Sequence, residues 1–249
     1  SRRQRQMCIR DSIGGSLMSY YQNHGQDVVG VDLIGNGGNI VEGDISQPET
    51  INQQLQECDV IIHTAALVSN AMQDSDMWRV NVLATRNLIQ AAKEHKVRRF
   101  VQISSIVAYG NSAEGELDET HPVHADGGSY VLTKLASEHV VLSEQANDDI
   151  EVVIIRPGDA YGPGSRPWII APLEAIAKNQ FMLPEKGEGF FRPIYIDDLV
   201  RGIAMASRHP DADGEIFNLS CEGYMFTKDY FTPHYLSLIH ISEPTRHLD

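Results

Sequence analysis

Short runs of β-branched residues alternate with longer amphipathic stretches from Ile13 onward, and this alternation restricts the possible folds most strongly. Such alternation predicts βα units around a parallel sheet that is covered by helices. Ser46 and Glu49 have capping-box spacing, so we expect Ser46 to cap a helix. We expect strands at 27–32, 39–42, 58–63, 99–103, 152–155 and 215–219, and helices at 13–24, 46–57, 76–96, 129–146, 168–179 and 197–208.

A glycine pair follows directly on Ile13, before any predicted strand. A doubly wound sheet that binds a dinucleotide begins with a strand and a Gly-x-x-Gly-x-x-Gly turn, whose glycines let the backbone approach the pyrophosphate. Only Ile13 and Gly14 of such a turn are present, and a loop before a helix is the alternative interpretation. We therefore expect an α/β fold of the Rossmann type, a doubly wound parallel sheet whose first strand is missing.

The net charge and the cysteine pattern exclude several classes of protein. The formal charge is -14, and no Lys/Arg cluster outside the N-terminal segment could follow a phosphate backbone, so we expect no nucleic-acid partner. No apolar run reaches the roughly eighteen residues of a membrane-spanning helix, so we expect no membrane partner. The three cysteines share no metal-ligand or disulfide spacing, which predicts no metal site and a cytoplasmic location.

The two ends of the chain are related through their coding DNA. Met7 to Ser12 can be encoded by a DNA segment whose reverse complement encodes Leu236 to Ile241. One element read on opposite strands explains both ends, and it resembles an adapter of sequencing libraries. We therefore expect 1–12 and 236–249 to be translated adapter, and the natural sequence to be truncated at both ends.

Asp32 lies at the end of a predicted strand, 18 residues after Gly14. A carboxylate at this position can accept hydrogen bonds from an adenosine ribose and repels a 2′-phosphate. This spacing favours NAD over NADP as cofactor. A solvated Asp at a strand end is the alternative interpretation.

Three residues have the types and the spacing that proton transfer needs. Ser105 lies where a predicted strand opens into a turn, and Tyr130 and Lys134 are four residues apart, so they share one face of a predicted helix. We expect the Lys134 ammonium to favour the phenolate of Tyr130, and Ser105 to hydrogen-bond the same substrate oxygen. Tyr224 and Lys228 repeat the spacing, but no serine-bearing strand end precedes them, so we expect no site there.

Further short motifs occur along the chain in a fixed order. They are Gly43-Asp44-Ile45, His63-Thr64-Ala65-Ala66, Asn81 to Leu88, Ser104-Ser105 with Tyr109-Gly110, Tyr130 with Lys134, Arg156 to Gly164 and Arg192 to Asp198. Over 13–231 this series resembles the extended short-chain dehydrogenase/reductase family, the group of NAD-dependent epimerases and dehydratases. The resemblance implies an NAD-binding domain at 13–164. It also implies a small substrate lobe at 165–235, interleaved with the last sheet elements and cut short.

The resemblance also implies a role for particular residues. It implies that Ser105, Tyr130 and Lys134 are catalytic, and that Asp159 and Arg192 contact the substrate. Arg192 is then a clamp for an anionic group such as a nucleotide diphosphate, with a surface salt bridge as the alternative. The implied cofactor-binding residues are Ile13, Gly14, Asp32, Asp44, Ile45, Ala65, Ala66, Leu67, Asn81, Tyr130, Lys134, Pro157 and Gly158.

The expected protein is an NAD-dependent enzyme that oxidises a carbinol of a small-molecule substrate. The ketone is either the product, as in a hydroxysteroid or alcohol dehydrogenase, or an intermediate of epimerisation or elimination, as with a nucleotide sugar. A non-catalytic NAD(H) sensor of the same fold is the alternative, and retention of all three catalytic residues argues against it. The sequence allows a homodimer. Because the phosphate-binding turn is incomplete, we expect the fragment itself to bind NAD weakly and to be inactive.

Overall fold

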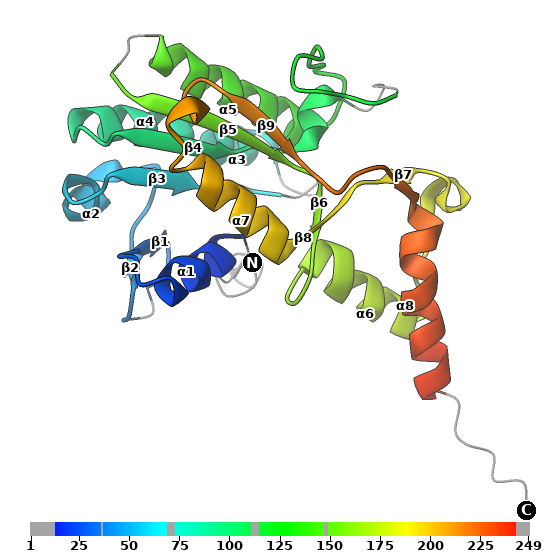
Figure 1. Ribbon diagram of the computed structural model, residues 1–249. Coiled ribbons are helices and arrows are strands. Elements are labelled where there is room, and N and C mark those ends of the chain that lie inside the picture. Colours follow the sequence, from blue (N-terminus) through cyan, green and yellow to red (C-terminus); the bar gives the residue numbers. More distant parts are fainter. Residues whose placement is uncertain (1–12, 36, 69–72, 111–114, 147–148, 243–249) are drawn as a thin grey trace, which may run out of the picture.

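A four-stranded parallel sheet forms the centre of the protein (Figure 1). The computed structural model describes residues 13–35, 37–68, 73–110, 115–146 and 149–242. The strands follow one another in the order β3 (Val60–His63), β4 (Arg99–Ile103), β5 (Glu151–Pro157) and β9 (Ile216–Leu219). All three neighbouring pairs are parallel, so the carboxyl ends of the strands lie at one edge of the sheet.

The side chains of β4 and β5 alternate between two buried faces. Val101 and Val153 point into a core cluster with α1 (Ile13–Asn23) and α7 (Ile196–Ala206). Phe100 and Val152 point into a second cluster on the other face. The elements of that face are α2 (Asn52–Gln56), α4 (Ala84–Glu94) and α5 (Ser129–Gln145). Helices on both faces make this the doubly wound arrangement expected from the sequence.

Two further strands form a separate parallel pair, β1 (Gly30–Asp32) with β2 (Ile40–Glu42). Among the described residues, β1 is not hydrogen-bonded to β3. β1 is shorter than the strand predicted at 27–32. The capping prediction was wrong, because Gln47 precedes the short 3-10 helix Pro48–Ile51 and the Ser46 hydroxyl instead donates to Asp44 Oδ1 at 2.7 Å.

The helix predicted at 76–96 is a continuous run of three segments. It comprises α3 (Asp74–Trp78), the π-helical turn η4 (Arg79–Leu83) and α4. A π-turn inserts one extra residue into an α-helix and is frequent at functional sites. Here it lies next to the carboxyl edge of the sheet, and it carries Asn81.

A small lobe is built from elements that the sequence did not predict, apart from α6 (Ala171–Ala177), which lies within the helix predicted at 168–179. Its strands are β6 (Asp159–Tyr161), β7 (Phe190–Phe191), β8 (Pro193–Tyr195) and β10 (Met225–Phe226), and its helices are α6 and α8 (Thr227–Ser242). β6 pairs with β8 in parallel, and β7 pairs with β10 in antiparallel orientation. Phe191, Tyr230 and Phe231 form its aromatic core. Because α8 extends to Ser242, the lobe boundary expected at residue 235 falls inside a helix.

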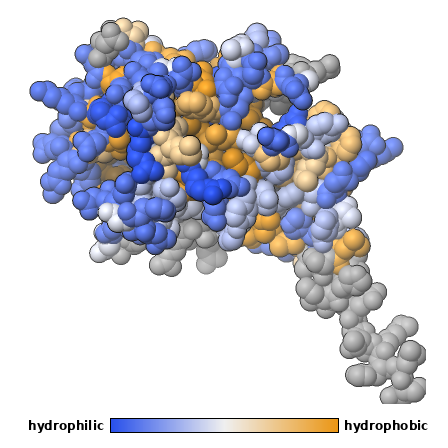
Figure 2. Space-filling view, viewed as in Figure 1, coloured by the Kyte–Doolittle hydropathy of each residue, from blue (hydrophilic) through white to orange (hydrophobic). Residues whose placement is uncertain are grey.

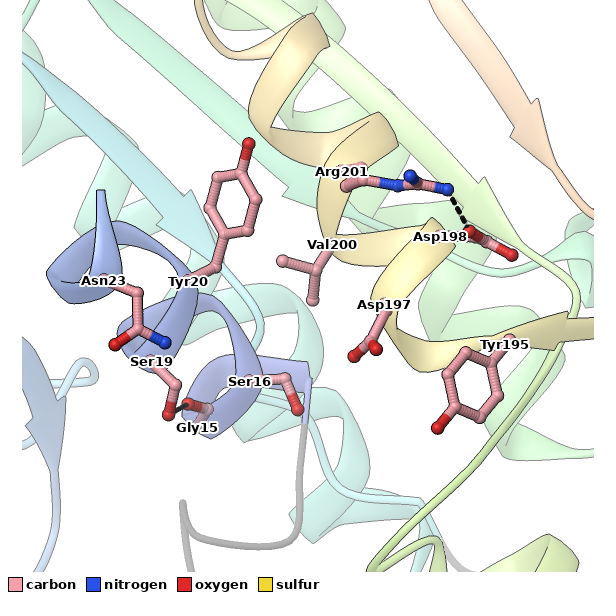
Figure 3. A pocket seen from close by; sticks show the side chains of 10 residues that line it. All are labelled: Gly15, Ser16, Ser19, Tyr20, Asn23, Tyr195, Asp197, Asp198, Val200 and Arg201. Atoms are coloured by element: carbon pink, nitrogen blue, oxygen red, sulfur yellow. Dashed lines mark hydrogen bonds and ion pairs between the residues drawn. The ribbon is translucent and has the colours of Figure 1, made fainter.

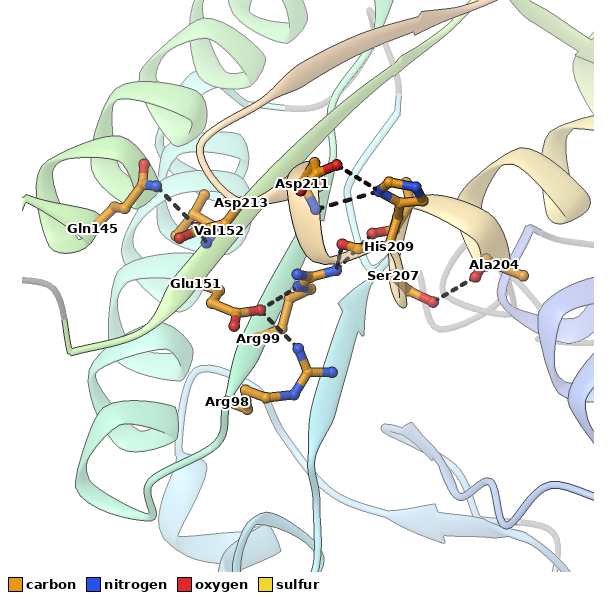
Figure 4. A network of polar contacts seen from close by, with 11 residues as sticks. Arg98, Arg99, Gln145, Glu151, Val152, Ala204, Ser207, His209, Asp211 and Asp213 are labelled. Atoms are coloured by element: carbon orange, nitrogen blue, oxygen red, sulfur yellow. Dashed lines mark hydrogen bonds and ion pairs between the residues drawn. The ribbon is translucent and has the colours of Figure 1, made fainter.

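Arg99 connects the amino edge of the sheet to the end of α7 (Figure 4). The fully buried guanidinium donates to Glu151 Oε2 at 2.6 Å and to the backbone oxygens of Ala206 and His209 at 2.9 and 2.8 Å. These carbonyls lie at the last turn of α7 or just beyond it, where a cation stabilises the helix dipole. This network lies at the start of β4 and β5, opposite the carboxyl edge.

The surface shows hydrophilic residues over much of one face, with hydrophobic residues between them near its centre (Figure 2). No helix in the described part of the chain is long and apolar enough to cross a membrane. The adapter segment expected at 1–12 lies outside the described residues, as does 243–249 of the segment expected at the other end.

Candidate active site

Ser105, Tyr130 and Lys134 lie together at the carboxyl end of β4. Ser105 follows the strand directly, and its hydroxyl accepts a hydrogen bond from Val107 N–H at 3.3 Å. Tyr130 and Lys134 are one turn apart on α5, and the Ser105 hydroxyl lies near enough to Tyr130 to lower its pKa. Lys134 Nζ lies 5.9 Å from the centre of the Tyr130 ring and donates to Ile103 O at 2.9 Å.

The ionisation of these side chains differs from the sequence expectation. We expected the Lys134 ammonium to favour the phenolate of Tyr130; burial opposes this by raising the pKa of Tyr130, and the Ser105 hydroxyl offsets only part of this rise. Burial also lowers the pKa of Lys134 to about 8, against the opposing effect of the Glu138 carboxylate. At neutral pH the structure therefore holds a neutral phenol beside a buried ammonium.

A side chain of η4 holds the described part of the loop after β3. Asn81 Oδ1 accepts from Leu67 N–H at 2.7 Å, and its Nδ2 donates to Leu67 O at 3.0 Å and to Thr133 Oγ1 at 3.0 Å. The loop residues Ala65 and Ala66 precede Leu67 at the same edge of the sheet. Asn81 thereby connects this loop to α5, which carries Tyr130 and Lys134.

Asp32 and Asp44 lie near each other, Asp32 at the end of β1 and Asp44 two residues after the end of β2. Gly43 N–H donates to Asp32 O at 2.8 Å, and a Cβ at Gly43 would approach the Ile51 side chain to 2.3 Å. The Asp44 carboxylate accepts hydrogen bonds from the Ser46 N–H and hydroxyl. Two carboxylates are thus fixed at the carboxyl ends of β1 and β2.

Ile45, Ile13 and Gly14 are further residues that were predicted to bind the cofactor. Ile45 is half-buried and packs against the core cluster under α2. Ile13 and Gly14 begin α1, and the chain before them lies outside the described residues.

A pocket between α1 and α7 adjoins Gly14, but it contains none of the three proton-transfer residues (Figure 3). It is lined by Gly15, Ser16, Ser19, Tyr20, Asn23, Tyr195, Asp197, Asp198, Val200 and Arg201.

Gly158 lies where β5 approaches the backbone before β8. Pro157 ends β5 opposite Leu219, and Gly158 N–H donates to Leu219 O at 2.9 Å. A Cβ at Gly158 would lie 2.4 Å from Arg192 O, which is closer than atoms can pack. The glycine therefore permits a close approach of two backbones beside the end of β5.

Asp159 and Arg192 are neighbours, and the Asp159 side chain interacts with the Arg192 backbone. Asp159 Oδ2 accepts from Arg192 N–H at 2.9 Å, and burial raises the pKa of Asp159 to about 6 despite the opposing effect of Arg192. The Arg192 guanidinium donates to Gly223 O at 3.0 Å and lies 5.6 and 5.4 Å from the rings of Phe190 and Tyr224. The alternative interpretation of Arg192, a surface salt bridge, gains no support among the described residues, since no described carboxylate pairs with it.

The model of the NAD dependent epimerase/dehydratase family matches residues 10–220 of this sequence. The chain belongs to this family. The match covers the central sheet, the lobe strands β6 to β8 and every sequence-predicted site residue described above.

Named relatives in this family catalyse different reactions. The chain is 29% identical over 185 residues to the dTDP-glucose 4,6-dehydratase of Streptomyces niveus, covering 72% of this chain and 54% of that protein. It is 29% identical over 187 residues to the 3 beta-hydroxysteroid dehydrogenase/Delta 5-->4-isomerase of Mycobacterium tuberculosis (strain CDC 1551 / Oshkosh), covering 70% and 50%. The chain thus spans about half the length of these curated relatives.

Solved structures of similar fold contain NAD. MoeE5 in complex with UDP-glucuronic acid and NAD superposes with a TM-score of 0.81 at 25% identity, covering 90% of this chain and 78% of that one. This neighbour binds a nucleotide sugar as well as the dinucleotide. The likeness supports both the Rossmann-type sheet and the dependence of the family on NAD.

The residues present fit part of an NAD site. Asp32 and Asp44 present carboxylate oxygens that could accept hydrogen bonds from ribose and adenine groups, and the loop at 65–67 is held at the carboxyl edge. When bound, NAD would supply hydride-transfer chemistry to this site. Within the described part of the chain, no group of three or more His, Cys, Asp or Glu side chains is placed to hold a metal ion.

The sequence analysis assigned no role to several polar residues of this site. Glu138, Arg156 and Tyr109 form a buried hydrogen-bonded set behind Lys134. Glu138 continues the four-residue spacing of Tyr130 and Lys134, which was a usable signal for it. The partners of Arg156 could not be read from the sequence, because they lie on other elements.

Proposed function

We propose that the protein is an NAD-dependent oxidoreductase of the epimerase/dehydratase family, with Ser105, Tyr130 and Lys134 as its proton-transfer residues. The observation that carries the proposal is the position of Ser105 beside Tyr130 with Lys134 one turn away, all at the end of β4. Two hydroxyls that converge on one point can hold a substrate oxygen between them.

The chemistry follows from the protonation states of the site. In the reducing direction, a hydride adds to the carbonyl carbon, and the Tyr130 phenol gives its proton to the carbonyl oxygen. In the oxidising direction, the carbinol carbon loses a hydride with its electron pair, and the carbinol proton passes to Tyr130. The neutral phenol is the form that protonates a carbonyl, and Lys134 supplies positive charge that stabilises the phenolate left behind.

The proposed substrate is a small molecule with an oxidisable carbinol, and a nucleotide sugar is the first candidate. Arg192 supports this choice, because a guanidinium suits phosphate oxygens and the Arg192 backbone is held by the half-buried Asp159. Nucleotide-sugar enzymes are also among the relatives and the structural neighbours. A hydroxysteroid is the second candidate, which the likeness to the hydroxysteroid dehydrogenase favours.

Two further properties are part of the proposal. We propose a cytoplasmic location, which the cysteine pattern supports. A homodimer stays an expectation that the molar mass in solution would decide. A role as a non-catalytic NAD(H) sensor is less well supported, because the site retains a full set of proton-transfer residues.

A substrate panel tests the proposed function. The protein encoded by the full reading frame, which all turnover and NAD-binding assays below also use, is incubated with NAD or NADH and with UDP-glucuronic acid, dTDP-glucose or a 3β-hydroxysteroid. Products are followed by chromatography and NADH absorbance. We expect turnover of a nucleotide sugar. Turnover of the steroid alone would move the assignment to the second candidate. Binding of NAD without turnover of any probe would favour the sensor.

A further inference from the structure

Glu138 lies directly behind the proposed proton-transfer residues. It is on α5, four residues after Lys134, and only 2% of its surface is exposed. Arg156 on β5 donates two hydrogen bonds to its carboxylate, from Nε to Oε1 at 3.0 Å and from Nη2 to Oε2 at 2.8 Å. The Ser104 hydroxyl donates to the same carboxylate. Two strands therefore hold this one side chain of α5.

Three consecutive residues at the end of β4 each contact one of three residues that are spaced by four on α5. The pairs are Ile103 with Lys134, Ser104 with Glu138 and Ser105 with Tyr130. Residues spaced by four lie on one face of a helix, so this face is fixed against the strand end at three points. Glu138 makes the contact that is anchored most firmly, since it is also paired with Arg156.

The anchor continues beyond the ion pair. Arg156 Nη1 donates to the Tyr109 hydroxyl at 2.9 Å, and the guanidinium lies 4.8 Å from the centre of that ring. The Tyr109 hydroxyl hydrogen-bonds in turn with Asp118 O at 3.0 Å and Asn218 Oδ1 at 2.9 Å. Arg156 is thereby held from the loop before α5 and from β9, so it cannot follow Glu138 if α5 moves.

We propose that Glu138 is a positioning residue for proton transfer at Tyr130 and Lys134, with Arg156 as its fixed anchor. The inference rests on the proposed function of these two residues. Loss of the Glu138 carboxylate removes the contact between Ser104 and Glu138. It also leaves the Arg156 guanidinium buried without its partner. A displacement of roughly 1 Å in a catalytic group lowers a rate about 100-fold, so a small shift of α5 is sufficient.

Glu138 also acts on Lys134 through its charge. The groups that face Lys134 are Tyr130 and Glu138 on α5 and His63 at the end of β3, while Arg156 on β5 faces Glu138. Burial lowers the pKa of His63 to about 3, so this ring is neutral at neutral pH. The negative carboxylate of Glu138 opposes the burial of the Lys134 ammonium.

The first test measures Lys134 directly and needs no substrate. The side-chain 13Cε signals of the lysines are titrated by NMR in the full chain, and Lys134 is assigned with Lys134→Arg. In Glu138→Gln we expect the titration midpoint of Lys134 to move to lower pH. Glu144→Gln is the control. Glu144 lies on α5, like Glu138, and forms an ion pair with Lys93, so its substitution should leave the titration midpoint of Lys134 unchanged. An unchanged midpoint in folded Glu138→Gln would overturn the inference.

The second test separates positioning from folding. With the substrate that the panel identifies, Glu138→Gln should lower kcat about 10- to 100-fold, with the KM for NAD within about twofold. The double variant Glu138→Leu with Arg156→Met removes both buried charges, so it should regain the unfolding midpoint without regaining kcat. Recovery of kcat together with stability would show a merely structural ion pair. If Tyr130→Phe leaves turnover unchanged, the proposed function itself fails, which is a different result.

Discussion

The side-chain amide of Asn81 pairs with both backbone groups of Leu67. One oxygen and one nitrogen of the amide satisfy the N–H and the C=O of the same residue, at 2.7 and 3.0 Å. A loop residue seldom finds both partners on one side chain. The π-turn η4 places Asn81 at this point, so a local irregularity of a helix determines the course of the loop after β3.

Asn81→Ala tests this relationship. The substitution leaves the Leu67 groups and Thr133 without their partner, and we expect a loss of about 1–3 kcal/mol in the free energy of unfolding. Asn87→Ala is the control, because Asn87 is exposed on α4 and makes one hydrogen bond, to Ser46 O. It should change stability by less than about 0.5 kcal/mol. Equal unfolding midpoints in urea for the two variants would contradict the assigned role of Asn81.

Gly158→Ala tests the close approach beside the end of β5. The new methyl carbon would lie 2.4 Å from Arg192 O, so the backbones must separate, at a cost of about 1–3 kcal/mol. A Cβ at Gly128 meets nothing within 4 Å, which makes Gly128→Ala the matched control. Thermal unfolding of both variants decides the point. If Gly158→Ala unfolds at the same temperature as Gly128→Ala, the two backbones do not approach each other as closely as described.

His63 predicts a defined loss of stability in acid. Thr85 Oγ1 donates to Asn81 O, so His63 Nε2 donates to Thr85 Oγ1 and carries the ring proton. Burial lowers the pKa of His63 to about 3, whereas the unfolded chain binds the proton near about pH 6.5. As the pH falls below the unfolded value, only the unfolded state gains a proton, and stability decreases until the folded pKa is reached.

The measurement is the free energy of unfolding in urea at pH 7 and pH 5, for the parent and for His63→Gln. Glutamine also donates a hydrogen bond but does not titrate. The stability difference between the two proteins should therefore change by about 2 kcal/mol between these pH values, to the disadvantage of the parent. A constant difference would show that His63 becomes protonated in the folded state.

Lys134→Met and Lys228→Met separate the site from its repeated spacing. Tyr224 precedes β10 and Lys228 lies in α8, so they share no helix face, and Lys228 Nζ lies over the ring of Phe226. We expect Lys134→Met to lower kcat about 100-fold or more and Lys228→Met to leave it unchanged. Similar rates in steady-state assays of both variants would remove Lys134 from the mechanism.

Local sequence patterns predicted the central sheet well. The strand expected at 99–103 is β4 with the same bounds, and the helix expected at 129–146 ends one residue earlier as α5. Both have long apolar patterns that match buried faces, which is the situation in which periodicity is most informative. The residues of the candidate site could also be proposed from the sequence, because Ser105, Tyr130 and Lys134 follow from motif and spacing.

Features that depend on long-range contacts were not predicted. The lobe strands β6, β7, β8 and β10 have two or three residues each, which is too short for any periodicity. The raised pKa of Tyr130 was not predicted either, since burial of its hydroxyl is a property of the folded chain. The side-chain partners of Arg156, Glu138 and Tyr109, lie on two other elements, so no local pattern could reveal them.

The most direct test of the account is turnover by Tyr130→Phe, measured beside NAD binding by calorimetry. The change removes one hydroxyl, and Tyr235→Phe on α8 is the control, because Tyr235 is half exposed and outside the site. We expect Tyr130→Phe to lose about 100-fold or more in kcat while the Kd for NAD changes by less than about threefold. Turnover by Tyr130→Phe at the rate of the control would contradict the assignment of proton transfer to Tyr130.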